Sequence, residues 1–467
     1  MKKKIIIISS ILLVITIFVA IIILNYLPKN KDDSKESNSL ETLQETKNNN
    51  SSLEVMLLSQ TENTITVEAK NNIIYTFSYQ INNPESPINV GDYLRLTYEG
   101  SLNPDREKQD IIITNCQNIT SDYQIQDILD DGFLNSYYDK ALSKLNSMTL
   151  EEKIAQILLV RYPDNGTEEQ NKYQFGGYLF FAKDFQGKSK EEVINMINKA
   201  NEVSKIPLIT AVDEEGGTVV RISSNPNLAS SSFKSPRTLY QEGGFDLIKE
   251  DTINKSHLLK SLGINLNLAP VVDVATNTSD YMYDRSIGLS TELTETYAKT
   301  VIEASKGLGV SYTLKHFPGY GNNVDTHTGT AIDNRSYENI LTNDLPPFQA
   351  GIASDAEAVL VSHNTVTSID ANNPASLSPS IHNLLHNMLD FQGIIITDDL
   401  DMGAVSNIEN NVVKALLAGN NLIIVTDYQK SINEVKTAIN NQIISENYLD
   451  KLVTKIIAWK YYKGLIN

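Results

Sequence analysis

The 467-residue chain predicts an α/β fold, a TIM-type (β/α)8 barrel, because apolar strand-like runs alternate with helical patterns from residue 123 to residue 467. The runs are ILLVRY, GGYLFF, PLITAVD, INLNLAPVVDV, VSYTLKHF, AVLVSHN, GIIITDD and NLIIVTD. A polar loop and a helical pattern such as KEEVINMINKANEV follow each run. In barrels of this type the functional side chains lie at the carboxyl ends of the strands. The polar residues that end these runs are therefore the first candidates for a site.

Three shorter segments precede the predicted barrel. Lysines at positions 2–4 are followed by an apolar run, Ile5–Leu27, which predicts a transmembrane helix in residues 1–27. Positive charge before the run places the rest of the chain outside a cell membrane as a single-pass protein, or secreted if the segment is cleaved. Residues 28–52 are polar and charged, which predicts a disordered linker.

Residues 53–122 contain short alternating runs such as TITVEA, IIYTFSY, YLRLTYEG and DIIITNC, separated by turn-rich stretches. This pattern predicts a small β module, either a barrel or a sandwich. Its role as a spacer or as a wall-binding module stays open, with a spacer favoured. Residues 123–467 then form the barrel domain.

The composition excludes some classes of function. Asp and Glu outnumber Lys and Arg by 57 to 39, for a net charge of −18, so nucleic acid is not an expected partner. The chain has a single cysteine, Cys116, which excludes an intramolecular disulfide framework and a cysteine-rich metal site.

The stretch LKHFPGYGNNVDTHTG, residues 314–329, holds two of the six histidines. Lys315 and His316 end a predicted strand, and Asp325 precedes His327 by two positions in the following loop. At this spacing a carboxylate can orient an imidazole and leave its other nitrogen ready for proton transfer. Taken alone, an Asp-x-His pair in a solvated loop more often has no catalytic role.

Three acids follow another predicted strand in GIIITDDLDMGA. Asp398 ends the strand, and burying such a carboxylate is costly unless it is paired or used. One of Asp399 and Asp401 is expected to cap a helix that begins near Met402. Capping is a poor explanation for all three acids.

Two further motifs supply arginines near strand ends. In ITAVDEEGGTVVRI, Asp213 ends a strand and Arg221 follows eight residues later, while YDRSIG places Arg285 in the loop after another strand. A carboxylate and a guanidinium over one pocket suit a polyhydroxylated ligand, because the first accepts and the second donates hydrogen bonds.

Together and in this order, these motifs resemble family 3 glycoside hydrolases, in particular the bacterial β-N-acetylhexosaminidase branch, over about Tyr138 to Asn467. The resemblance implies that Asp398 is the nucleophile and His327 the general acid/base, with Asp325 orienting His327. The residues that it assigns to sugar binding are Asp213, Arg221, Arg285, Lys315 and His316. The chain departs from the family pattern at Tyr320, Asn322 and Asn323, residues that shape the loop of His327.

The resemblance implies a retaining exo-β-N-acetylglucosaminidase that acts on peptidoglycan-derived or related amino sugars without a metal or organic cofactor. We expect a monomer whose partners are its carbohydrate substrate and, through the N-terminal helix, the membrane. Two alternatives stay open: a phosphate-dependent β-N-acetylglucosaminide phosphorylase, and a non-catalytic protein that binds cell-wall sugars.

Overall fold

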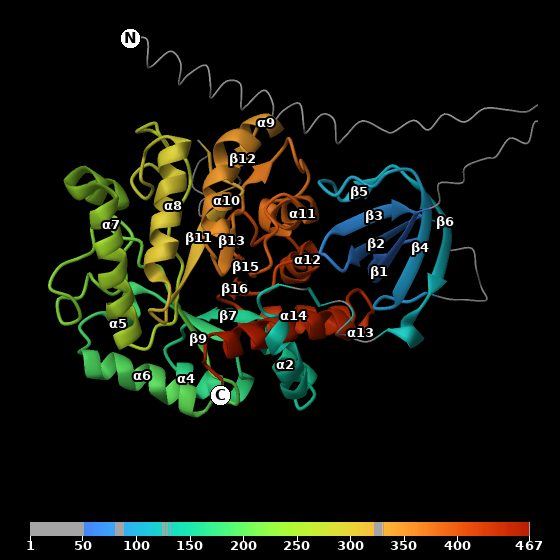
Figure 1. The fold of residues 1–467 in the computed structure, drawn as a ribbon. Helices are drawn as coiled ribbons and strands as arrows, with labels where there is room; N and C mark the ends of the chain where they lie inside the picture. Colours follow the sequence, from blue (N-terminus) through green and yellow to red (C-terminus); the bar gives the residue numbers. More distant parts are fainter. Residues whose placement is uncertain are drawn as a thin grey trace, which may run out of the picture. The chain divides into compact units, whose positions relative to one another are not determined.

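Eight short parallel strands form the central sheet of the computed structural model (Figure 1). In chain order they are β7 (Leu158–Arg161), β8 (Gly177–Phe180), β9 (Ile209–Val212), β10 (Leu266–Asn267), β11 (Ser311–Phe317), β13 (Ala358–Val361), β15 (Ile394–Thr397) and β16 (Ile423–Val425). Neighbouring strands pair in sequence order, and β16 also pairs with β7. A parallel bridge between Ile396 and Leu422 connects β15 to β16 and closes the ring. The eight strands occupy the eight apolar runs, and the predicted (β/α)8 barrel is confirmed.

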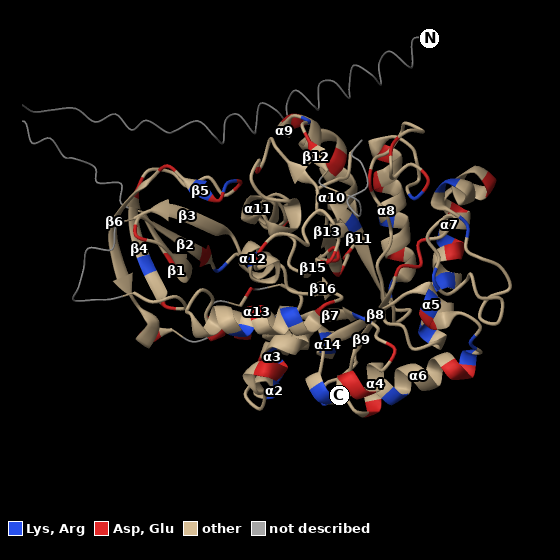
Figure 2. Ribbon diagram, turned by 180° about the vertical axis from the view of Figure 1, so that it is seen from behind, with Lys and Arg blue, Asp and Glu red and all other residues tan. Residues whose placement is uncertain are grey.

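Helices follow the strands around the barrel (Figure 1). They are α2 (Tyr138–Leu145), α3 (Leu150–Gln156), α4 (Gly166–Tyr173), α5 (Ala182–Phe185), α6 (Lys190–Glu202), α7 (Pro236–Ser261), α8 (Thr291–Ser305), α9 (Tyr337–Asn339), the π-helical turn η4 (Ile340–Asp344), α10 (Leu345–Ala353), α11 (Pro379–Asn387), α12 (Asn411–Ala418), α13 (Tyr428–Asn440) and α14 (Glu446–Tyr462). Charged side chains lie along outer helices such as α4 and α6 (Figure 2), whereas the barrel strands are almost wholly buried. This pattern explains why the strands read as continuous apolar runs in the sequence.

Local sequence signals define the helix beginnings. At α6, the Ser189 side chain accepts a hydrogen bond from the Glu192 backbone N–H, and the Glu192 carboxylate accepts one from the Ser189 N–H. Thr149 and Glu152 form the same reciprocal pair at the beginning of α3. Such pairs satisfy backbone donors that the first helical turn leaves free.

The structure describes residues 51–79, 88–123, 127, 129–130, 132–321, 329 and 331–466. Within these ranges, no helix combines the length and the apolar character needed to cross a membrane. The apolar run Ile5–Leu27 and residues 28–50 of the predicted linker lie outside them. The last two linker residues, Ser51 and Ser52, begin strand β1 (Ser51–Gln60), which corrects the predicted boundary at residue 52.

A second sheet lies before the barrel in the chain and has six strands, in the order β5-β3-β2-β1-β4-β6. Its strands are β1 (Ser51–Gln60), β2 (Thr64–Ala69), β3 (Ile74–Ser78), β4 (Tyr93–Glu99), β5 (Lys108–Gln109) and β6 (Ile112–Asn118). The pairs are antiparallel except for β3 with β5. The described strands thus form one sheet, which corrects the expectation that allowed two packed sheets of a sandwich.

The central strand β1 buries both of its faces. Val55 and Leu57 belong to the core of the small sheet, while the alternate residues Met56 and Leu58 belong to the large core of the barrel. Successive strand residues point to opposite faces, so one short strand serves two cores. The small sheet therefore packs directly on the barrel.

Hydrogen bonds fix this contact between the two sheets. The buried Asn383 side chain on α11 accepts from the Ile74 N–H at 2.8 Å and donates to the Ile74 carbonyl at 2.8 Å. On α14, Lys451 forms a buried ion pair with Glu68 of β2 at 2.5 Å. Such buried partners tie the sheet to α11 and α14, because each would be costly to leave unpaired.

Candidate active site

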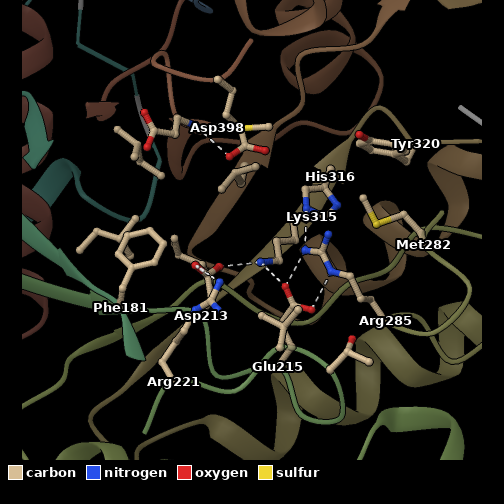
Figure 3. Close-up of a pocket in the computed structure, with 18 of the residues that line it drawn as sticks. Phe181, Asp213, Glu215, Arg221, Met282, Arg285, Lys315, His316, Tyr320 and Asp398 are labelled. Atoms are coloured by element: carbon tan, nitrogen blue, oxygen red, sulfur yellow. Dashed lines mark hydrogen bonds and ion pairs between the residues drawn. The ribbon is translucent and has the colours of Figure 1, made fainter. Parts of the chain in front are cut away.

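A cavity of about 560 Å³ opens at the carboxyl ends of the barrel strands (Figure 3). Its wall combines charged groups with apolar and aromatic ones. The residues that line it include Arg161, Phe181, Asp213, Glu215, Arg221, Met282, Arg285, Lys315, His316, Tyr320, Asp398 and Asp399. Its position is the one that parallel barrels use for ligands.

A chain of ion pairs forms one wall of the cavity (Figure 3). The Lys315 ammonium on β11 lies 2.8 Å from Asp213 Oδ1 and 2.6 Å from Glu215 Oε1. Arg285 donates to both oxygens of Glu215, from Nε at 3.0 Å and from Nη2 at 2.7 Å. Two cations and two carboxylates therefore meet at one place, and each can donate to or accept from ligand hydroxyls.

These groups hold one another in the charged state. Burial raises the pKa of Glu215, but Arg285 and Lys315 outweigh it and leave the pKa well below its usual range. Burial lowers the pKa of Lys315, but Asp213 and Glu215 outweigh it and raise the pKa. The wall thus presents fixed ions, whose hydrogen bonds are stronger than those of neutral groups.

Glu214, the first of the two glutamates after Asp213, holds the loop that carries Arg221. Glu214 is fully buried, and one of its oxygens accepts the backbone N–H groups of Arg221 and Ile222 at 2.7 Å each. These bonds fold the loop so that Arg221 Nη2 lies 3.8 Å from Asp213 Oδ2. The Arg221 guanidinium also lies over the ring of Phe181, 5.3 Å from its centroid.

His316 is held by an aspartate from the neighbouring strand region. Its Nδ1 lies 2.7 Å from Asp273 Oδ2, and its Nε2 lies 3.3 Å from Arg285 Nη2. Since a guanidinium only donates, Nε2 is the accepting nitrogen and Nδ1 carries the proton that bonds to Asp273. The second oxygen of Asp273 accepts the Tyr320 N–H at 2.7 Å, so the same carboxylate orients two cavity residues.

Asp398 follows β15 and faces the cavity from the side opposite the ion pairs (Figure 3). One of its oxygens accepts the Asp399 backbone N–H at 2.8 Å. Burial raises the pKa of Asp398, but electrostatic interaction with neighbouring basic side chains, His363 first and Lys315 among the rest, together with the Asp399 N–H, holds it below its usual value. At neutral pH this carboxylate is ionised, as a nucleophile must be.

Asp399 and Asp401 do not cap a helix near Met402, which corrects that expectation. Residues 401–410 form turns, and α12 begins only at Asn411. Asp399 pairs instead with Arg161 from β7, and burial raises its pKa to about 6. Asp401 accepts backbone N–H groups at 426 and 427, at 2.5 and 3.1 Å, and so joins this loop to the end of β16. A strand end and a helix cap have similar local sequences, which is why the prediction was wrong here.

The structure brings six of the eight predicted site residues together on one cavity: Asp213, Arg221, Arg285, Lys315, His316 and Asp398. The other two, Asp325 and His327, lie outside the described residues. Sequence reasoning missed Glu215 and did not assign a site function to Asp273 or Arg161. The doubled acid in AVDEEGG was the available signal for Glu215, because a second acid beside a strand end needs a partner when it is buried.

The barrel with this charged cavity defines an enzyme of the glycoside hydrolase class. Residues 149–459 match the profile of the Glycosyl hydrolase family 3 N terminal domain, and the chain belongs to this family. Its sequence places it in the bacterial β-N-acetylhexosaminidase branch. It is similar to a beta-hexosaminidase of Xylella fastidiosa (strain M23), with 29% identity over 270 residues, 56% of this chain and 79% of the relative.

Solved structures show the same fold. A family 3 beta-N-acetylglucosaminidase from Paenibacillus sp. str. FPU-7 superposes with a TM-score of 0.64 and 25% identity, over 68% of this chain and 63% of that protein. A family 3 glycosyl hydrolase from Mycobacterium smegmatis gives a TM-score of 0.61 and 26% identity, over 67% of this chain and 98% of that protein.

Proposed function

We propose that this protein is a retaining exo-β-N-acetylglucosaminidase that removes terminal β-linked N-acetylglucosamine from peptidoglycan-derived or related amino sugars. The observation that carries the proposal is the ionised Asp398 at the end of β15, facing the ion pairs across the cavity. An anionic nucleophile opposite a set of fixed donors and acceptors suits a sugar whose hydroxyls are held while its anomeric carbon is attacked. The names of the relatives support the same substrate class.

The first step in this proposal forms a bond between Asp398 and the anomeric carbon as the glycosidic bond breaks. Lys315, Asp213 and Glu215 bind sugar hydroxyls, and His316, Arg221 and Arg285 complete the contacts. His327, oriented by Asp325, donates a proton to the departing oxygen and then removes one from the water that hydrolyses the glycosyl-enzyme. These two loop residues are assigned from the family resemblance.

The proposed location is the outer face of a cell membrane, with residues 1–27 as an anchor. Lysines before the apolar run and the bulk of the chain after it support this orientation. Attachment there would bring the enzyme to cell-wall fragments.

Release of p-nitrophenol from its β-N-acetylglucosaminide by the purified full-length chain tests the proposal. We expect Asp398→Ala to lower kcat by at least about a thousandfold, in the range seen when a nucleophile is removed. The exposed Asp164→Ala serves as a control with unchanged turnover, since its contact with Lys183 is solvent-exposed. Full activity in Asp398→Ala would show that the nucleophile is wrongly assigned.

The same assay distinguishes the alternatives. Turnover that requires phosphate and yields sugar 1-phosphate would identify a phosphorylase. A folded protein that binds N-acetylglucosamine oligomers without cleaving them would instead be a non-catalytic sugar-binding protein.

A further inference from the structure

The Gly319–Gly321 turn, which follows β11 and precedes the loop of His327, is held by the Asp273 carboxylate. Gly319 and Gly321 flank Tyr320 with positive φ angles of 126° and 60°, conformations that suit glycine. Between them, the Tyr320 N–H is fixed by Asp273, the carboxylate that also holds His316. This three-residue turn therefore carries one side chain of the cavity and adjoins another.

Arg335 forms an ion-pair cluster next to this turn. The guanidinium donates to Asp333 from Nε at 3.0 Å and from Nη2 at 2.7 Å, and to Asp344 Oδ2 from Nη1 at 2.8 Å. Both carboxylates are buried, with side-chain exposures of 1% and 0%. Asp333 lies on β12 (Ile332–Asp333), which pairs with β14 (Thr365–Val366) and so fixes the chain where it returns from the loop.

The cluster packs directly against the glycine backbone. A Cβ atom added to Gly319 would lie 2.2 Å from Asp344 Oδ1, and one added to Gly321 would lie 2.7 Å from the Arg335 Cζ. A side chain at either position would displace the ion-pair cluster and would be strained at the positive φ angle. Arg335 thus spans from the chain after residues 322–328 to the backbone just before them.

Charge at the cluster is nearly balanced around Arg335. The groups that face Asp344 are Arg335, Asp333 and Asp273. Burial, opposed by Arg335, raises the pKa of Asp344 to about 7, and its Oδ1 has no hydrogen-bond partner in the part of the chain that the structure describes. One proton on Asp344 at neutral pH would leave Arg335 balanced against Asp333.

We propose that Arg335 is a positioning residue: bridged between Asp333 and Asp344, it fixes the Gly319–Gly321 turn and so sets the direction in which the chain enters the loop that contains Asp325 and His327. This inference rests on the proposed function, because it treats that loop as the source of the general acid. Arg335, Asp333 and Asp344 are not among the six cavity residues that the family resemblance assigned to binding or catalysis.

The test compares two substrates with Arg335→Ala: the p-nitrophenyl glycoside, whose leaving group needs little protonation, and chitobiose, whose sugar leaving group needs a proton donor. We expect kcat on chitobiose to fall about 10- to 100-fold, as for a catalytic group misplaced by about 1 Å, with a smaller loss on the p-nitrophenyl glycoside. Arg335→Lys keeps the charge but lacks the planar fork that bridges two carboxylates, and should lie between wild type and Arg335→Ala.

Lys463→Ala is the matched control, because Lys463 also forms a partly buried ion pair, with Glu357 at 2.9 Å, and lines no part of the cavity. Lys463→Ala should change kcat on both substrates by the same factor or leave it unchanged. Equal losses on the two substrates in folded Arg335→Ala, checked by thermal unfolding, would overturn the positioning role. His327→Ala distinguishes the proposed function from this inference. If its loss of kcat is the same on chitobiose and on the p-nitrophenyl glycoside, His327 is not the general acid. If the loss differs between the substrates for His327→Ala but not for Arg335→Ala, only the positioning role of Arg335 is rejected.

Discussion

Glu215 and Arg285 form a two-point ion pair inside the barrel mouth, at 3.0 and 2.7 Å, although 70 residues separate them in the chain. Both side chains are largely buried, with exposures of 2% and 15%. Glu215 also contacts Lys315 at 2.6 Å, so a single carboxylate pairs with two cations. This relationship makes Glu215 the centre of the ion-pair wall.

Glu215→Gln should damage both stability and activity. Removing the charge leaves Arg285 and Lys315 without a shared counter-ion, and breaking a buried pair costs about 3–5 kcal/mol in the free energy of unfolding. We expect denaturant titration to show a matching loss in the free energy of unfolding, and steady-state kinetics to show a raised KM for the p-nitrophenyl glycoside. Glu242→Gln provides the comparison, because the Glu242 pair with Lys234 is exposed and should be worth less than about 1 kcal/mol. Equal stability of the two variants would contradict the central role of Glu215.

The barrel was predictable from sequence because its eight strands are almost wholly buried and most of them read as nearly continuous apolar runs. The cavity residues at strand ends, such as Asp213 and Asp398, followed from the same pattern. Glu215 and Asp273 were harder to assign, because their function depends on partners 70 and 43 residues away. The turns after Asp401 were missed because tertiary hydrogen bonds, here to the N–H groups at 426 and 427, replace the helix that local sequence favours.

Tyr320 should contribute to binding through its ring. The ring packs edge-on against His316, with centroids 5.7 Å apart, and lies 5.6 Å from the ring of Tyr281. An aromatic pair contributes about 0.5–1.5 kcal/mol beyond burial, so losing both contacts should lower the free energy of unfolding by about 1–3 kcal/mol. Because the ring also holds His316 in the cavity, we expect Tyr320→Ala to raise KM for the p-nitrophenyl glycoside as well.

Tyr320→Phe retains the ring and should stay within about threefold of wild type, since a hydrogen bond of ordinary strength is the most that it removes. Steady-state kinetics on the two variants gives the comparison. If Phe is as harmful as Ala, the hydroxyl rather than the ring is what matters.

Asp130, in the segment between the small sheet and the barrel, accepts a hydrogen bond from Asn72 at 3.3 Å and pairs with Lys455 of α14 at 3.0 Å, and this contact should depend on pH. Burial raises the pKa of Asp130, but Lys455, the Tyr138 hydroxyl and Lys451 outweigh it and hold the pKa well below its usual value. Because the folded-state pKa lies below the unfolded value of about 3.9, the ionised carboxylate stabilises the fold above that pH. This stabilisation is lost as the pH falls from there toward the folded-state pKa.

Asp130→Asn should therefore be destabilised by about 3–5 kcal/mol at pH 7, because Lys455 loses its buried partner. The difference in free energy of unfolding between Asp130→Asn and wild type should narrow below about pH 4, where the Asp130 carboxylate of the wild type also begins to be protonated. Thermal unfolding of both proteins at pH 7, 5 and 3 measures this trend, with Glu151→Gln, an exposed pair with Lys436, as a variant that should follow wild type. A constant difference across the three pH values would mean that Asp130 stabilises the contact by shape rather than by charge.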